Sequence, residues 1–127
     1  MSADASWYAP GRIVYVKLEG ILLKEEMDSV NQMIAQYVRE GQPPVHLFVD
    51  ALGLEKFPLD LKQFSGAKLY LREPNLGKLA IITRQGAFVR FFASVITQAA
   101  HIEMQMFDEV EAGLDFLRQA DGTLKQT

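Results

Sequence analysis

The order of its secondary-structure signals constrains this chain more than any other feature. A short hairpin signal comes first, and strand-like and helix-like segments then alternate to the end of the sequence. This order is typical of α/β folds, in which helices connect neighbouring parallel strands. It predicts one domain with a mixed, mostly parallel β-sheet, an antiparallel N-terminal hairpin and about four helices.

The hairpin and the first helix have the clearest patterns. Ala9-Pro10-Gly11 separates a β-prone segment at residues 6–8 from residues 12–19, in which alternate side chains are apolar. From residue 22 the apolar residues recur at three- and four-residue intervals, and the pattern stops at the Gly-Gln-Pro-Pro segment 41–44. This spacing predicts an amphipathic helix between them.

Further strand signals follow the first helix. Residues 45–49 predict a strand that ends in Asp50, with Gly53 permitting a tight bend after it. Residues 79–82 are apolar throughout, which is typical of a strand covered on both faces and predicts the centre of the sheet. Residues 102–107 predict the last strand. Helices are predicted at 57–71, at 86–100 and from residue 110; the domain is expected to span 1–120, with a fraying polar tail at 121–127.

Composition narrows the classes of function. The chain has 127 residues and no cysteine, so it has neither a disulfide nor a thiolate for catalysis or metal binding, and we expect a cytoplasmic protein. A formal net charge of −3 disfavours nucleic acid as a partner. No apolar stretch is long enough to predict a membrane span or a secretion signal.

Catalytic and metal-binding motifs are missing from the sequence. His46 and His101 have no second ligand at a metal-binding interval, and we expect both to be structural. The glycines are scattered singly, which gives no phosphate-binding loop, and no serine lies in a nucleophile elbow. We therefore expect no catalysis, no metal and no cofactor, although one sequence leaves open a triad assembled in space.

One loop has the composition of an anion site. Thr83-Arg84-Gln85-Gly86 follows an apolar strand and precedes a predicted helix, and Arg90 comes about one helical turn later. Two guanidinium groups beside free helix N–H groups suit a phosphate or a carboxylate. The alternative is a solvated turn with Arg90 on the exposed face. Asp50 is a second candidate, either as a ligand-binding carboxylate or as a turn acceptor.

The predicted third helix is apolar around more of its circumference than one sheet face requires. This predicts a homodimer interface, a pocket for an apolar ligand, or burial beneath a neighbouring helix. Of the first two alternatives, a homodimer is favoured. The side chains concerned are Phe88, Phe91, Phe92 and Val95.

Two passages carry a family resemblance: Val45-His46-Leu47-Phe48-Val49-Asp50, and residues 107–117 with their acidic helix start and apolar finish. With the order of segments, they make residues 7–119 resemble the SpoIIAA-like branch of the STAS superfamily, which is also similar to Sec14-type lipid-binding domains. The resemblance implies a regulatory or binding module that acts on a protein or a small anion. Its alternatives are a Sec14-like carrier of lipid or another apolar ligand, and an enzyme of unfamiliar mechanism.

The resemblance also exposes a departure. Related anti-sigma factor antagonists carry a phosphorylatable serine at the start of the second helix, and the matching segment here contains Leu59 and Asp60 but no serine. Asp60 is either a permanent negative charge in place of phosphate or a residue that favours the helix N-terminus. We therefore expect no phosphorylation switch of that kind.

Overall fold

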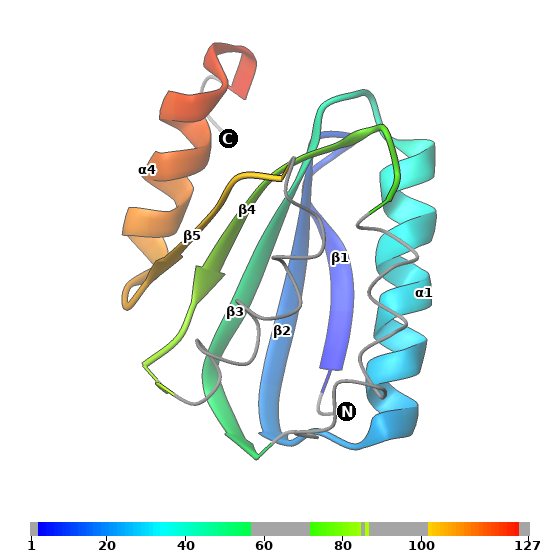
Figure 1. Cartoon of the computed structure of the whole chain (residues 1–127), viewed down its shortest axis with the longest axis vertical. Coiled ribbons are helices and arrows are strands. Elements are labelled where there is room, and N and C mark those ends of the chain that lie inside the picture. Colours follow the sequence, from blue (N-terminus) through cyan, green and yellow to red (C-terminus); the bar gives the residue numbers. More distant parts are fainter. Residues whose placement is uncertain (1–2, 57–71, 85, 87–101, 125–127) are drawn as a thin grey trace.

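The computed structural model describes residues 3–56, 72–84, 86 and 102–124, which include a five-stranded sheet of order β1-β2-β3-β4-β5 (Figure 1). β1 runs antiparallel to β2, and the other neighbouring strands are parallel. The predicted mixed sheet with an antiparallel N-terminal hairpin is confirmed. The elements are β1 (Ala3–Ala9), β2 (Ile13–Ile21), α1 (Lys24–Glu40), β3 (Val45–Lys56), β4 (Leu76–Ile82), β5 (Met104–Phe107), α4 (Val110–Ala120) and a short 3-10 helix (Gly122–Leu124).

Helix α1 forms where the apolar spacing predicts it. Met27, Ile34 and Val38 lie on its buried face, and acidic residues in the first turn complement the helix dipole. The helix ends at Glu40, and the next residue, Gly41, passes close to its neighbours. A Cβ atom at position 41 would lie 2.6 Å from Val45 Cγ2 and 2.7 Å from the Gly11 carbonyl oxygen.

The sheet has an apolar cluster on each face, and α1 and α4 cover opposite faces. α1 packs mainly on β1 and β2, whereas α4 packs on β4 and β5, so the two helices lie on opposite sides in Figure 1. Leu79 and Ile81 of β4 join the cluster beneath α1, while Ala80 and Ile82 join the cluster beneath α4. The double coverage predicted for this strand is confirmed.

Two details of the predicted sheet are wrong. The central strand is β3, because β5 adds only one strand beyond β4. In addition, β3 does not end at Asp50 but continues to Lys56, since β2 supplies a pairing partner as far as Ile21. Gly53 accordingly lies inside β3 opposite Glu19 and makes no bend.

The C-terminal residues also differ from the fraying tail expected from the sequence. Asp121 follows α4, and residues 122–124 then form the 3-10 helix. Leu124 is 1% exposed and belongs to the apolar cluster beneath α4. The segment through Leu124 is therefore part of the packed domain.

Candidate functional site

The structure describes part of the predicted anion site. Thr83 is buried directly after β4, and its N–H donates to the Phe107 carbonyl oxygen at 2.9 Å. Arg84 and Gly86 are exposed beyond it. The other predicted site residues lie outside the described residues: Gln85, Arg90, Leu59, Asp60, Phe88, Phe91, Phe92 and Val95.

Asp50 is held by hydrogen bonds within the sheet. Its Oδ2 accepts from the Tyr15 hydroxyl at 2.8 Å, and its Oδ1 accepts from the Leu52 N–H at 3.2 Å. Burial and the hydrogen bond to Asp50 together raise the pKa of Tyr15 to about 12. The tyrosine is therefore a fixed neutral donor, and Asp50 is an acceptor within a strand rather than at a turn.

The sheet face that α4 covers is divided into a polar half and an apolar half. The strand register places one row of residues across all five strands. The members of this row on β1, β2 and β3 are polar, and those on β4 and β5, beneath α4, are apolar. A hollow of about 380 Å³ lies in the polar half, lined by Asp4, Ser6, Tyr15, Lys17 and Glu19. The full row is Asp4, Lys17, Asp50, Ile82 and Phe107.

The carboxyl end of β2 exposes two aliphatic side chains. Ile21 is 56% exposed and Leu23 is 54% exposed, whereas Leu22 between them is buried. Ile21 pairs with Lys56 in the β2–β3 ladder, and the Leu22 N–H donates to the Lys56 carbonyl oxygen at 2.8 Å. We call Ile21, Leu23 and Lys56 the β2–β3 tip. It lies at the lower end of the sheet in Figure 1.

The opposite end of the sheet contains a polar cluster in which His46 is buried and Arg12 and Asp121 are half-buried. Asp121 Oδ2 accepts from Arg12 Nη2 at 2.6 Å and lies 2.8 Å from His46 Nε2. His46 Nδ1 accepts from the Lys78 backbone N–H at 2.9 Å, so Nε2 carries the proton and donates to Asp121. Asp121 Oδ1 accepts from the backbone N–H and hydroxyl of Thr123. The cluster joins the hairpin, β3, β4 and the C-terminal turn.

Burial keeps this histidine neutral. His46 is 2% exposed, and the loss of solvation lowers its pKa despite the opposing effect of Asp121. Burial also favours the neutral acid at Asp121, but the hydrogen bonds from Thr123 and His46 outweigh it and hold the pKa of that carboxyl well below its usual range. A surface depression of about 520 Å³ lies over the pair, and Lys78 and Glu103 form an ion pair at its rim.

Sequence reasoning expected His46 to be structural but missed its partners. The ring nitrogens contact residues 78 and 121, which are far from position 46 in the chain. One signal was available: Asp121-Gly122-Thr123 is a turn sequence in which an aspartate accepts from the residue two positions later. That pattern predicts an ordered turn rather than a fraying tail.

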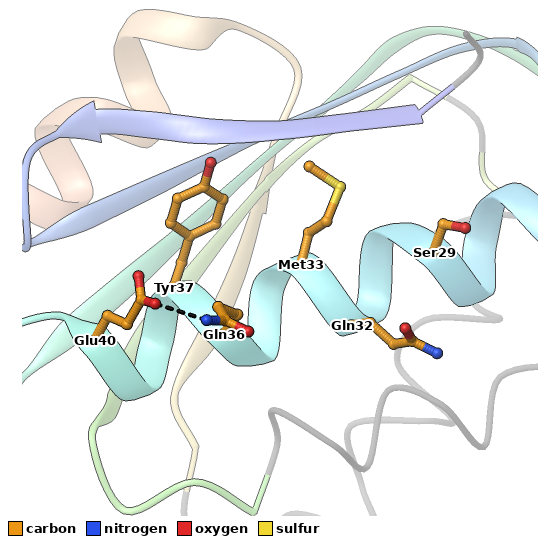
Figure 2. Close-up of a pocket in the computed structure, with 6 residues that line it drawn as sticks. All are labelled: Ser29, Gln32, Met33, Gln36, Tyr37 and Glu40. Carbon is orange, nitrogen blue, oxygen red and sulfur yellow. Dashed lines mark hydrogen bonds between the residues drawn. The ribbon is translucent and has the colours of Figure 1, made fainter.

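A third hollow follows the outer side of α1. Figure 2 shows Met33 and Tyr37 directed toward β1, with Ser29, Gln32, Gln36 and Glu40 on the more open side. Its volume is about 580 Å³. Gln36 Nε2 donates to Glu40 Oε1 at 2.7 Å, and the Tyr37 ring packs edge-on against Trp7. The hollow is an open groove, and its one charged lining residue is engaged by Gln36.

Among residues 3–56, 72–84, 86 and 102–124, no group of three or more histidines or carboxylates is arranged to hold a metal ion. No helix within the same residues is long and apolar enough to cross a membrane.

Comparison of the fold with solved structures finds several matches, and two of them resemble it over most of their length. One is the anti-sigma factor antagonist SpoIIAA in its unphosphorylated form, with a TM-score of 0.60 and 13% identity, covering 92% of this chain and 96% of that one. The other is an uncharacterised protein with a SpoIIAA-like fold from Shewanella loihica PV-4, with a TM-score of 0.61, 17% identity and 91% of each chain covered. These likenesses show that the chain has a SpoIIAA-like α/β fold.

The sequence itself gives the family. The SpoIIAA-like family model matches residues 13–118, and the chain belongs to that family. The resemblance drawn from its segments and motifs is confirmed. No curated protein matches the chain significantly.

Proposed function

We propose that this chain is a cytoplasmic, non-catalytic regulatory module that acts by binding a protein partner at the β2–β3 tip. Its family supports a binding or regulatory role, and one structurally similar protein is by its name an antagonist of an anti-sigma factor. The observation that carries the proposal is the exposure of Ile21 and Leu23, each more than half accessible, on either side of one buried residue.

The surroundings of these two side chains have the anatomy of a protein interface. Exposed charged residues border them: Lys24 and Glu25 at the start of α1, and Glu55 and Lys56 at the end of β3. An apolar centre with a charged rim buries aliphatic area on binding, while the rim charges orient the partner. The backbone of the tip is fixed by the β2–β3 ladder, so binding requires little ordering of the chain.

The test is site-specific photo-crosslinking in the native host. A photoreactive residue at position 23 should give a discrete adduct with a partner protein, and one at Tyr8, which is also exposed, should not. The double variant Ile21→Ser, Leu23→Ser should then bind the purified partner at least about tenfold more weakly, since two buried aliphatic contacts are lost. Equal affinity in the variant, or equal adducts at both positions, contradicts the proposal.

A small anion at the loop after β4 is the second candidate. Arg84 is exposed there and forms no ion pair with a described residue. Titration with inorganic phosphate should shift the Arg84 guanidinium resonance in the wild type, and Arg84→Gln should abolish saturable binding. Linear, non-saturable shifts exclude this candidate. Arg90, the other predicted cation, lies outside the described residues.

The apolar-ligand alternative depends on Phe88, Phe91, Phe92 and Val95, which also lie outside the described residues. It stays a prediction from the sequence. Native mass spectrometry of gently purified protein tests it, because a bound lipid would add a defined mass. A ligand-free mass in repeated preparations contradicts it.

A further inference from the structure

β1 is an edge strand whose outer side has no strand partner in the described part of the chain. It pairs with β2 alone and stands last in the sheet order. Alternate residues of an edge strand direct their N–H and C=O groups away from the sheet, where a further strand can pair with them. The pairing of β1 with β2 is regular from Ala3 to Trp7, so these residues offer a regular edge.

The two edges of the sheet are protected to different degrees. β5, at the other edge, has four residues, and α4 packs against it. β1 has seven residues and contains neither lysine nor proline, which commonly protect an exposed edge. Its one charged residue, Asp4, lines the hollow on the polar sheet face. β1 is therefore the edge that is open to strand addition.

Helix α1 borders this edge. It packs on β1 and runs beside it in the same direction (Figure 2). Met33 and Tyr37 point toward β1, and the Tyr37 hydroxyl donates to the Ala5 carbonyl oxygen at 3.5 Å, a distance at which such hydrogen bonds are weak. The open hollow of about 580 Å³ follows the same side of the helix. A strand added to β1 would direct alternate side chains toward Met33 and Tyr37.

An exposed stripe along this side of α1 carries negative charge at both ends and contains no cation. We call Glu25, Ser29, Gln32, Gln36 and Glu40 the α1 stripe. Gln36 donates a hydrogen bond to Glu40 but does not neutralise its charge. Neither glutamate forms an ion pair with a described residue. The stripe therefore favours a partner with cations at both ends.

The separation of the two glutamates sets the length of that partner. Glu40 follows Glu25 by 15 positions, a distance of about 22 Å along a helix. An extended chain covers about 22 Å in roughly seven residues. β1 itself has seven residues, so a strand of this length could pair with the edge and reach both glutamates.

A second copy of this chain does not have the required charge. Two β1 strands paired antiparallel about a two-fold axis would place both α1 helices antiparallel on one face of the continued sheet. Glu25 of one copy would then lie toward Glu40 of the other, and like charges repel.

We propose that the β1 edge and the α1 stripe bind an extended basic segment of a partner protein, which adds to the sheet as a further strand. The segment has about seven residues, with Lys or Arg near each end and apolar side chains at alternate positions between them. Main-chain hydrogen bonds to β1 hold it, and Glu25 and Glu40 select its charge. This surface is separate from the β2–β3 tip, so the inference does not depend on the proposed function.

Titration with a synthetic peptide tests the proposal. The probe is the capped peptide Lys-Thr-Val-Thr-Val-Thr-Lys, whose lysines and valines share one face of an extended strand. It should bind with a Kd of about 1 mM or lower. Within residues 3–7, every second amide should gain protection from hydrogen exchange, because the others already pair with β2. An absence of saturable binding, or of this alternating protection, overturns the proposal.

Charge variants of the peptide and of the protein test the selection. The peptide with Glu in place of Lys should bind the wild type at least about tenfold more weakly, and Glu25→Lys, Glu40→Lys should reverse this preference. Glu109→Lys, Glu111→Lys makes the same change of charge at exposed glutamates beside α4 and should leave the preference intact. Equal binding of both peptides to the wild type, an unchanged preference in the first variant, or a reversed one in the second contradicts the proposal.

Two further measurements distinguish strand addition from the other outcomes. N-methylation of two adjacent central residues of the lysine peptide removes a donor toward β1 whichever way the peptide faces, and should weaken binding at least about fivefold. Equal binding would mean attachment by charge alone and overturns the proposal. Protection of the β1 amides that rises with protein concentration, in the absence of peptide, would mean that a second copy occupies the edge and would also overturn it.

Discussion

Gly77 of β4 lies directly against the imidazole of His46 in β3. A Cβ atom at position 77 would approach His46 Nδ1 to 2.6 Å and Cε1 to 2.7 Å, closer than such atoms pack. The ring cannot move aside, because Lys78 and Asp121 hold both of its nitrogens. Gly77 is therefore required by the space that a buried histidine occupies, and not by an unusual backbone angle.

Gly77→Ala should lower the free energy of unfolding by about 1–3 kcal/mol, the usual cost of overpacking a rigid site. Gly122→Ala is the matched control, since a Cβ atom there would meet no atom within 4 Å. The control should stay within about 0.5 kcal/mol of the wild type. Chemical denaturation of both variants measures the difference, and an equal stability of the two would refute this account of Gly77.

Asp121→Ala should destabilise the fold by about 2–3 kcal/mol, because it leaves the buried His46 and the Arg12 guanidinium without their acceptor. Asp115→Ala removes an exposed carboxylate that only pairs with Arg118 at 3.5 Å, and should cost less than about 0.5 kcal/mol. Thermal or chemical unfolding distinguishes the two aspartates. Similar losses of stability in both variants would mean that the Asp121 cluster stabilises the fold no more than an exposed ion pair does.

The contribution of Asp121 should also disappear in acid. The folded state lowers the pKa of this carboxyl, so the unfolded chain takes up a proton first as the pH falls. Its stabilisation is complete above about pH 4 and is lost as the pH drops toward the folded pKa. The stability difference between wild type and Asp121→Asn should accordingly narrow below pH 4. A difference that stays constant there would contradict the lowered pKa.

Tyr15 should ionise at a higher pH than an ordinary tyrosine. Its pKa is raised to about 12 by burial and by the hydrogen bond to Asp50. Because the unfolded tyrosine ionises near pH 10, the stabilisation is present below about pH 10 and is lost as the pH rises toward 12. Asp50→Asn should lower the ionisation midpoint of Tyr15, measured by NMR on labelled tyrosine. An unchanged midpoint would contradict the contribution of Asp50 and leave burial as the main cause.

The sequence further predicts a homodimer formed through Phe88 and Phe92. Light scattering over a range of concentrations should give twice the mass of the chain for the wild type, and the mass of one chain for Phe88→Ser, Phe92→Ser. Circular dichroism of the variant controls for folding. A wild-type protein that stays monomeric at all concentrations contradicts this prediction. It would favour the other two alternatives for these side chains, burial beneath a neighbouring helix or an apolar ligand pocket.

Much of the fold follows from local pattern. The alternation along β2, the helical period of α1 and the uniformly apolar residues 79–82 of β4 are each patterns within one segment, and each indicates which of its side chains are buried. They predicted the mixed sheet and the coverage of β4 on both faces. The continuation of β3 past Asp50 could not be predicted in this way, because the last residues of β3 are held by pairing with β2.

The candidate sites likewise divide into features that a local pattern predicts and features that depend on contacts between distant segments. Exposed Arg84 follows from its place in a polar loop after a buried strand. The Tyr15–Asp50 bond and the His46–Asp121 contact join residues 35 and 75 positions apart, and no local pattern encodes either partner. Cross-strand register brings the first pair together, and the packing of α4 brings the second.

The place of Asp121 and Leu124 in the packed domain changes where the domain can be cut. By composition the last residues look dispensable, and a truncation after Ala120 would seem harmless. Such a truncation would remove Asp121, which accepts hydrogen bonds from Arg12 and His46. It would also remove Leu124, whose apolar side chain is 1% exposed. A shortened or fused form of this protein should therefore keep the chain at least through Leu124. A fusion partner attached earlier would take the place of residues that pack in the apolar cluster beneath α4.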